Sequence, residues 1–192
     1  MAIICLSDFI ALPEGEQAAD CPAGWLGLFA LSAGFGVESA ADEYFRKNDN
    51  YSPLLLTSLA NALTEAFTEE IHLRVRREWW AYAKDESLSA EEILKGGYKG
   101  IRPAFGYPCC PDHEDKRIAF ELLETEKRCG MKLSESAMII PAASVCGMVF
   151  ASPAAYYFGL GTIGDDQLKD WAGRKGISIE EARKMKIPST TL

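Results

Sequence analysis

The most familiar chemical pattern in this sequence is a glycine-rich segment, Gly159-Leu-Gly-Thr-Ile-Gly164. A G-x-G-x-x-G run between an apolar stretch and a helix is typical of loops that bind the pyrophosphate of a dinucleotide. Two observations oppose that interpretation. Only 28 residues of the 192-residue chain follow Gly164, without a second strand to complete a βαβ unit. Asp165 and Asp166 would also place negative charge where a phosphate binds. We therefore predict a connecting turn here.

A second candidate for chemistry is the run Cys109-Cys-Pro-Asp-His113. Thiolates and imidazoles bind zinc, but adjacent cysteines rarely chelate one ion together, and the sequence has no further C-x-x-C or H-x-x-x-H pair. His72 is the only other histidine, so no Ser-His-Asp or Cys-His arrangement can be assembled. The sequence predicts no metal site and no catalytic residue.

The composition is that of an ordinary globular protein. Of 192 residues, 48% are hydrophobic and 25% are charged, which suits one domain with a core. The formal net charge of -8 argues against a nucleic-acid surface or an anionic membrane. The sequence shows neither a secretory signal nor an apolar run long enough to span a membrane. We therefore expect a cytoplasmic protein whose six cysteines are free thiols.

A long helix over residues 52–82 is the clearest predicted element. Pro53 suits its first turn, where the missing N–H would have no helical partner. Apolar residues recur at every fourth position: Leu55, Leu59, Leu63, Phe67, Ile71, Val75 and Trp79. Another face carries Glu65, Glu69, His72 and Arg76. Periodicity alone predicts that this polar stripe faces solvent.

The remaining elements predict the fold class. Strand-like runs occupy residues 3–10, 25–31, 145–150 and 155–160, and the last two would form a hairpin. A loop over 13–22 separates the first two runs. Helices are expected over 37–47, 89–96, 112–130 and 165–175, with a capped turn from Ser178. This irregular order favours an α+β fold, a single domain over residues 1–192 with a twisted, largely antiparallel sheet and flanking helices.

The strongest functional indication is one ordered run. Arg102-Pro-Ala-Phe-Gly-Tyr-Pro108 is followed by Cys110-Pro-Asp-His113. Together they resemble R-P-A-x-G-Y-P-x-C-P-[DE]-H, a signature of the S-adenosylmethionine-binding reactivation domain of cobalamin-dependent methionine synthase. Further segments along nearly the whole chain resemble the same family: Cys5–Phe9, Ala66–Trp80, Gly130–Ser136, Ala143–Phe150 and Asp166–Gly176.

The resemblance implies a role in repairing a cofactor. Domains of this family bind S-adenosylmethionine in a shallow groove and dock on the cobalamin-binding domain of methionine synthase. Cobalamin in the inactive Co(II) state is reduced by flavodoxin or an equivalent electron donor, and the reduced cobalt then takes the methyl group. This sequence has no cobalamin-binding D-x-H-x-x-G motif. A partner domain or chain would therefore supply cobalamin.

The resemblance also assigns site residues. The expected S-adenosylmethionine-binding residues are Arg102, Pro103, Ala104, Tyr157, Phe158 and Glu65. The expected cobalamin-facing residues are Gly106, Tyr107 and His113. These residue types suit the ligand, because a guanidinium pairs well with a carboxylate and aromatic rings favour a nearby sulfonium. The prolines would hold the segment extended, with N–H and C=O groups around Ala104 left for the adenosyl moiety.

Departures from the family pattern keep two alternatives open. The resemblance begins almost at the C-L-x-D-F segment, so a preceding helical stretch with an acidic ligand-binding residue is expected to be absent. Gly96 replaces a frequent glutamate. One alternative is a module that docks on a corrinoid protein without using S-adenosylmethionine. The other is a methyltransferase or dehydrogenase built on the glycine motif at 159–164.

Overall fold

An antiparallel sheet joins distant parts of the chain. In the computed structural model, which describes residues 5–10, 24–161 and 163–184, strand β1 (Gly27–Ser32) pairs with β4 (Ser144–Val149). A shorter antiparallel pair, β2 (Lys132–Leu133) with β3 (Ile139–Ile140), contacts β4. The antiparallel pairing and the surrounding helices confirm the predicted α+β class.

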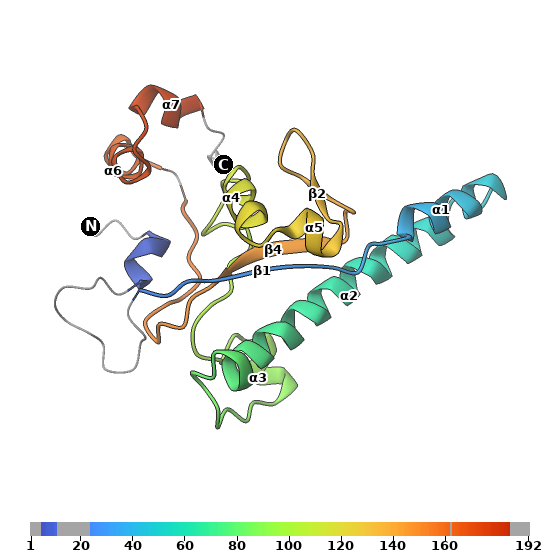
Figure 1. Ribbon diagram of the computed structural model, residues 1–192, viewed down its shortest axis with the longest axis horizontal. Helices are drawn as coiled ribbons and strands as arrows, with labels where there is room; N and C mark the ends of the chain where they lie inside the picture. Colours follow the sequence, from blue (N-terminus) through green and yellow to red (C-terminus); the bar gives the residue numbers. More distant parts are fainter. Residues whose placement is uncertain (1–4, 11–23, 162, 185–192) are drawn as a thin grey trace.

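Helices cover both faces of the β1–β4 sheet (Figure 1). Helix α2 (Ser52–Arg74) crosses one face, and α1 (Val37–Arg46) packs against α2. On the other face lie α4 (Asp115–Leu122) and α5 (Thr125–Cys129). Helices α3 (Ala90–Leu94), α6 (Asp165–Lys175) and α7 (Ile179–Lys184) lie toward the edges of the fold. Within the described ranges, no helix combines the length and apolar character needed to cross a membrane.

Local capping explains the helix ends that the sequence predicted. At α3, Ser89 N donates to Glu92 Oε2 at 2.8 Å, and Glu92 N donates back to Ser89 Oγ at 3.3 Å. Helix α6 ends at Gly176, whose φ of 69° is left-handed. The helix predicted over 112–130 is instead two helices, because the backbone of Glu124 is left-handed, with φ 50°.

Two of the predicted strands are wrong. Residues Leu6–Phe9 form a short 3-10 helix, η1, because the Asp8 carboxylate accepts a hydrogen bond from Cys5 N at 2.8 Å and closes a turn. Residues 155–160 form no strand, since the edge of β4 with which they would pair is already occupied. The predicted loop at 13–22 and residues 3–4 lie outside the described part of the chain.

The segment 101–105 occupies that edge of β4. Four backbone hydrogen bonds of 2.9–3.1 Å hold it: Ile101 N to Phe150 O, Phe150 N to Ile101 O, Met148 N to Pro103 O, and Phe105 N to Cys146 O. Pro103 accepts with its carbonyl but contributes no N–H to the ladder, a loss that is tolerated because segment 101–105 lies at the edge of the sheet. Gly147 permits the close approach, because a Cβ there would lie 2.6 Å from Pro103 O and 2.9 Å from Ala104 Cα.

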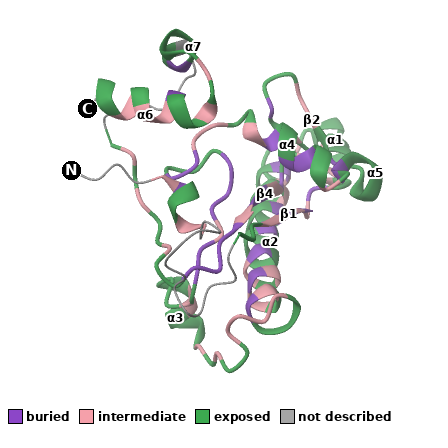
Figure 2. Cartoon of the chain, turned by 60° about the vertical axis from the view of Figure 1, so that its left-hand side comes forward, coloured by how far each residue is buried: buried purple, intermediate pink, exposed green. Residues whose placement is uncertain are grey.

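The inward face of helix α2 carries polar residues, and the second half of the predicted polar stripe lies on it (Figure 2). His72 and Arg76 are 1% and 0% exposed, whereas Leu59 and Leu63 are 57% and 53% exposed. The prediction that the polar stripe faces solvent is therefore wrong for His72 and Arg76. Glu65 does lie exposed, and Glu69 is half-buried.

Hydrogen bonds inside the fold explain this reversal. Thr64 Oγ1 donates to Ala143 O at 2.9 Å, which ties α2 to the segment before β4. Arg76 lies in a π-helical turn, η2 (Val75–Trp79), that continues α2. Its Nε donates to Glu86 Oε1 at 2.9 Å, so the buried guanidinium faces a carboxylate. A buried charge is tolerated when it is paired in this way.

The glycine at position 147 provides a test of the sheet edge. We predict that Gly147→Ala lowers the free energy of unfolding by about 1–3 kcal/mol, because the new methyl group displaces segment 101–105. Gly173→Ala in α6 is the matched control, since no heavy atom lies within 4 Å of its Cβ position. The control is expected to gain about 0.5–1 kcal/mol from helix propensity. If urea denaturation gave Gly147→Ala the same free energy of unfolding as the wild type, the result would contradict the proposed close contact.

Candidate functional site

A groove of about 510 Å³ lies along segment 101–105. All six residues expected to bind S-adenosylmethionine line it, as does one of the three expected to face cobalamin: Arg102, Pro103, Ala104, Tyr157, Phe158 and Glu65, with Tyr107. They come from α2, from the β4 edge and from the irregular segment after β4. The volume lies within the range of small-molecule sites. Tertiary structure thus gathers residues that are up to 93 positions apart (65 to 158).

The charged centre of the groove is Arg102. Its Nη2 forms an ion pair with Glu69 Oε1, and its side chain is 15% exposed. Its Nε and the second Glu69 oxygen, Oε2, are both buried, and neither has a hydrogen-bond partner. An unsatisfied buried donor costs about 1–3 kcal/mol. The guanidinium of Arg102 is therefore only partly paired within the described residues.

The hydroxyl of Tyr157 is fixed beside this arginine. It accepts a hydrogen bond from Arg102 N at 2.9 Å and lies 3.3 Å from the hydroxyl of Tyr98. Burial, followed by the hydrogen bond to Tyr98, raises the pKa of Tyr157 above its ordinary value. Tyr157 is therefore a neutral phenol near pH 7, and its ring forms a fixed wall of the groove.

Tyr98 also lines the groove, although it is not among the residues that the sequence predicts to bind the ligand. Its ring lies 4.6 Å from the Arg76 guanidinium and meets the His72 ring edge-on at 4.8 Å. The buried stripe of α2 thus supports Tyr98, which in turn contacts Tyr157. The available signal was its place between two glycines, Gly97 and Gly100, directly before the signature run.

The backbone at Ala104 is only partly available. Pro103 O accepts from Met148 N at 2.9 Å, and Ala104 O accepts from Tyr107 N at 3.2 Å. The sequence predicted that carbonyls here would be free, and these two are not. Ala104 lies opposite Gly147 at a non-hydrogen-bonded position of the ladder, so its N–H points away from β4. Among the described residues, that N–H has no hydrogen-bond partner.

The three residues expected to face cobalamin lie next to one another, and of the three only Tyr107 lines the groove. Tyr107 is half-exposed, and its hydroxyl donates to Glu65 Oε1 at 3.4 Å. Burial and the negative charge of Glu65 raise the pKa of Tyr107. Gly106 and His113 do not line the groove but touch one another: a Cβ at Gly106 would lie 2.4 Å from His113 Cε1. Their role toward cobalamin remains a prediction.

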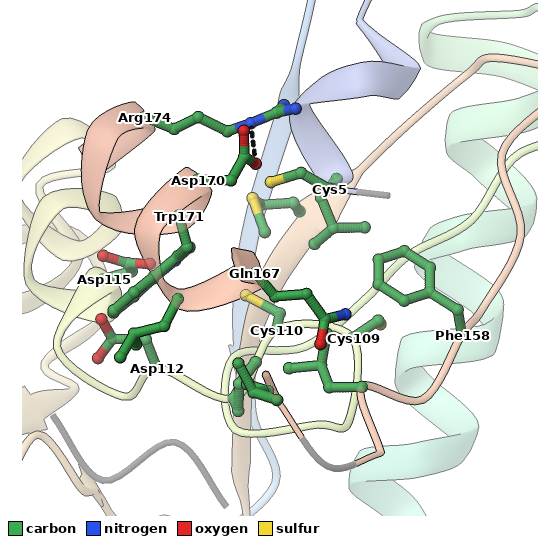
Figure 3. Close-up of a pocket in the computed structure, with 16 residues that line it drawn as sticks. Cys5, Cys109, Cys110, Asp112, Asp115, Phe158, Gln167, Asp170, Trp171 and Arg174 are labelled. Carbon is green, nitrogen blue, oxygen red and sulfur yellow. Dashed lines mark hydrogen bonds and ion pairs between the residues drawn. The ribbon is translucent and has the colours of Figure 1, made fainter. Parts of the chain in front are cut away.

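A second cavity of about 220 Å³ lies between η1, α6 and the loop at 109–112 (Figure 3). Cys109 and Phe158 line both cavities. Its charges are paired internally, as in the ion pair of Asp170 with Arg174 at 2.8 Å. Burial raises the pKa of Cys110 to about 12, so this thiol is protonated near pH 7. Among the described residues, no cluster of three His, Cys, Asp or Glu side chains is placed to hold a metal ion.

The glycine motif leads directly into α6. The residues directly before it, 155–158, form no strand, and Thr162 lies outside the described residues. Gly164 N donates to Gln167 Oε1 at 2.9 Å, which caps the helix in place of a phosphate. Of the three motif glycines, Gly159 lines the groove beside Phe158.

Comparison with known proteins identifies relatives of the whole arrangement. Residues 1–176 match the family model described as vitamin B12 dependent methionine synthase, activation domain. A solved structure, described as the MetH reactivation domain bound to AdoHcy, is 42% identical, with a TM-score of 0.78. The alignment covers 87% of this chain and 51% of the solved one. The chain therefore spans about half the length of that relative.

The buried histidine behind Tyr98 gives a prediction for pH. Burial, helped by the charges of Arg76 and Arg102, lowers the pKa of His72 to about 2. The ordinary value in an unfolded chain is about 6.5. Between these values the unfolded state takes up a proton that the folded state does not, so the free energy of unfolding falls as pH falls below about 6.5. One such group contributes up to about 1.4 kcal/mol per pH unit.

We expect His72→Gln to remove this contribution. Urea denaturation of the wild type and the variant at several values between pH 6.5 and pH 4 measures the difference in slope. His113→Gln is the control, because that ring is exposed and its pKa is lowered less. Parallel curves for wild type and His72→Gln would contradict the neutral, buried state of His72.

Proposed function

This chain belongs to the activation-domain family of vitamin B12 dependent methionine synthase, and on that basis we propose that it binds S-adenosylmethionine and supports reductive remethylation of a partner's cobalamin. The observation that carries the proposal is the groove that gathers all six expected ligand residues around one incompletely paired arginine. The relative at 42% identity, whose structure is described as bound to AdoHcy, supports the same ligand class.

The groove fits the chemical groups of S-adenosylmethionine. The incompletely paired guanidinium of Arg102, which lines the groove, suits the ligand carboxylate. The outward N–H of Ala104 suits an acceptor nitrogen of the adenine. The exposed carboxylate of Glu65 and the ring of Tyr157 suit the ammonium and sulfonium cations. Each group thus has a counterpart of matching charge or polarity.

Bound S-adenosylmethionine supplies an activated methyl group for transfer to reduced cobalamin. The protein's own task is alignment, which needs no general base. Its side chains must also avoid taking the methyl group themselves. Burial raises the pKa of Cys109 and of Tyr157, so the thiol and the phenol in the groove wall stay protonated and weakly nucleophilic near pH 7.

The partners in this proposal lie outside the described chain. Cobalamin is presented by the cobalamin-binding domain of a methionine synthase, and the electron comes from flavodoxin or an equivalent donor. Remethylation consumes one electron and one S-adenosylmethionine per Co(II) cobalamin and releases S-adenosylhomocysteine. Tyr107, which lines the groove, and the neighbouring Gly106 and His113 form the surface that we assign to the corrin side.

One observation favours a second candidate, a docking module that does not use S-adenosylmethionine. Glu69 already occupies the Nη2 end of Arg102, so a ligand carboxylate has to share the guanidinium or displace Glu69. Calorimetric titration with S-adenosylmethionine separates the two candidates. Binding favours the first, and absence of binding by a folded protein favours the second.

Arg102 is the sharpest test. We predict that Arg102→Gln weakens S-adenosylmethionine binding by about 10- to 100-fold, the loss expected when a charge-assisted hydrogen bond is removed. Isothermal titration calorimetry measures this change. Arg117→Gln is the matched control, because Arg117 is exposed on α4 and pairs with Glu114 away from the groove. Its affinity should equal that of the wild type.

Two results would contradict the proposal. One is an unchanged affinity of Arg102→Gln for S-adenosylmethionine. If Gly161→Ala lost binding instead, the enzyme built on the glycine motif at 159–164 would be favoured. The other is the failure of the folded protein to increase methylcobalamin formation by a synthase truncated before its reactivation domain, with an electron donor and S-adenosylmethionine present.

A further inference from the structure

A buried lysine, Lys116, touches the imidazole of His113, one of the residues that we assign to the corrin side. Lys116 lies in the first turn of α4 and is 4% exposed. Its Nζ lies 2.6 Å from His113 Nδ1 and donates to Ala137 O at 3.1 Å. No carboxylate among the described residues forms an ion pair with it. Burying an ammonium group without a counter-ion costs free energy. An apolar side chain would fill the same space without that cost, so the amino group itself needs an explanation.

The proton between these two side chains has one favoured position. Burial lowers the pKa of both groups, that of Lys116 from 10.5 and that of His113 from 6.5. The lowered pKa of His113 leaves its imidazole neutral near pH 7. Lys116 Nζ already donates to Ala137 O. With Lys116 as the ammonium donor to His113 as well, Nδ1 accepts and the imidazole proton resides on Nε2.

A glycine holds the other side of the ring. Gly106 has φ 98°, and a Cβ there would lie 2.4 Å from His113 Cε1 and 2.9 Å from Nε2. The ring thus packs directly against the backbone next to Tyr107, which lines the groove. His113 itself is exposed. Gly106 fixes one side of the imidazole and Lys116 contacts Nδ1. The second nitrogen, Nε2, belongs to a residue that is otherwise exposed.

We propose that Lys116 is a positioning residue that holds His113 in one orientation as an Nε2–H donor for an oxygen acceptor on the docked corrinoid partner. The docking part rests on the function proposed above, whereas the state of the imidazole is a property of the free protein. A neutral donor with a fixed tautomer suits an amide carbonyl, the polar group carried by corrin side chains. Lys116 acts through His113 and needs no contact of its own with the partner.

Nuclear magnetic resonance of the full chain labelled with 15N-histidine tests the first part. The chain has two histidines, so His113 can be assigned by comparison with His113→Gln. We expect the wild-type spectrum to show the Nε2–H tautomer of His113 alone. A wild-type ring protonated on Nδ1 would overturn the proposal without any variant.

Lys116→Met provides the second measurement. Loss of the ammonium should release the second tautomer and shift the His113 titration midpoint upward, since Asp112 and Glu114 then act on the ring without an opposing cation. The control is Lys127→Met, which removes an exposed lysine paired with Glu124 on α5. An unchanged His113 spectrum in folded Lys116→Met would overturn the positioning role.

Docking on an isolated cobalamin domain of methionine synthase tests the donor role. We expect His113→Gln and Lys116→Met each to weaken docking by about 2- to 10-fold, the loss of one hydrogen bond. The double variant should be no weaker than either, because both remove the same interaction. Additive effects would overturn the donor role. Failure of the proposed function itself appears separately, as absence of S-adenosylmethionine binding by the wild type.

Discussion

The backbone ladder between segment 101–105 and β4 is the interaction on which the site depends. Four hydrogen bonds fix the register of this segment, and the register decides which groups point into the groove. Ala104 falls opposite Gly147, so its N–H is directed outward. Arg102 N is directed outward as well and meets Tyr157. A side chain at position 147 would prevent the contact, so one glycine in β4 permits the geometry of the whole site.

Behind the groove, buried polar groups form a supporting layer beside the apolar core. The guanidinium of Arg76 pairs with Glu86 and lies under the ring of Tyr98, which also meets His72. Tyr98 then reaches the hydroxyl of Tyr157. Such a network specifies one arrangement of rings, because any other leaves buried charges and donors unpaired. This explains why His72 of α2 and Arg76 of η2 are buried although apolar residues are available on the same helix.

Charged and neutral polar groups lie side by side around the groove. Arg102 and Glu65 line it, and Glu69 pairs with Arg102, so these charges suit a ligand that carries a carboxylate and cations. The hydroxyl of Tyr107, which donates to Glu65, and the imidazole of His113, which packs against Gly106, are neutral polar groups. Burial keeps the Cys109 thiol and the Tyr157 phenol in the groove wall protonated near pH 7, which suits the proposed methyl transfer, in which the protein aligns two reactants.

The sequence by itself indicated the fold class and the capped helices, and its resemblance to a known family supplied the family and the six residues that line the groove. A cap or a signature run can be recognised without the structure, because it involves residues a few positions apart. Only the tertiary structure decided that residues 155–160 form no strand, that His72 and Arg76 are buried, and that Lys116 is buried with its Nζ on Ala137 O. The physical reason is that hydrophobic periodicity measures which side chains prefer to leave water. It carries no information on which buried polar groups find partners across the fold.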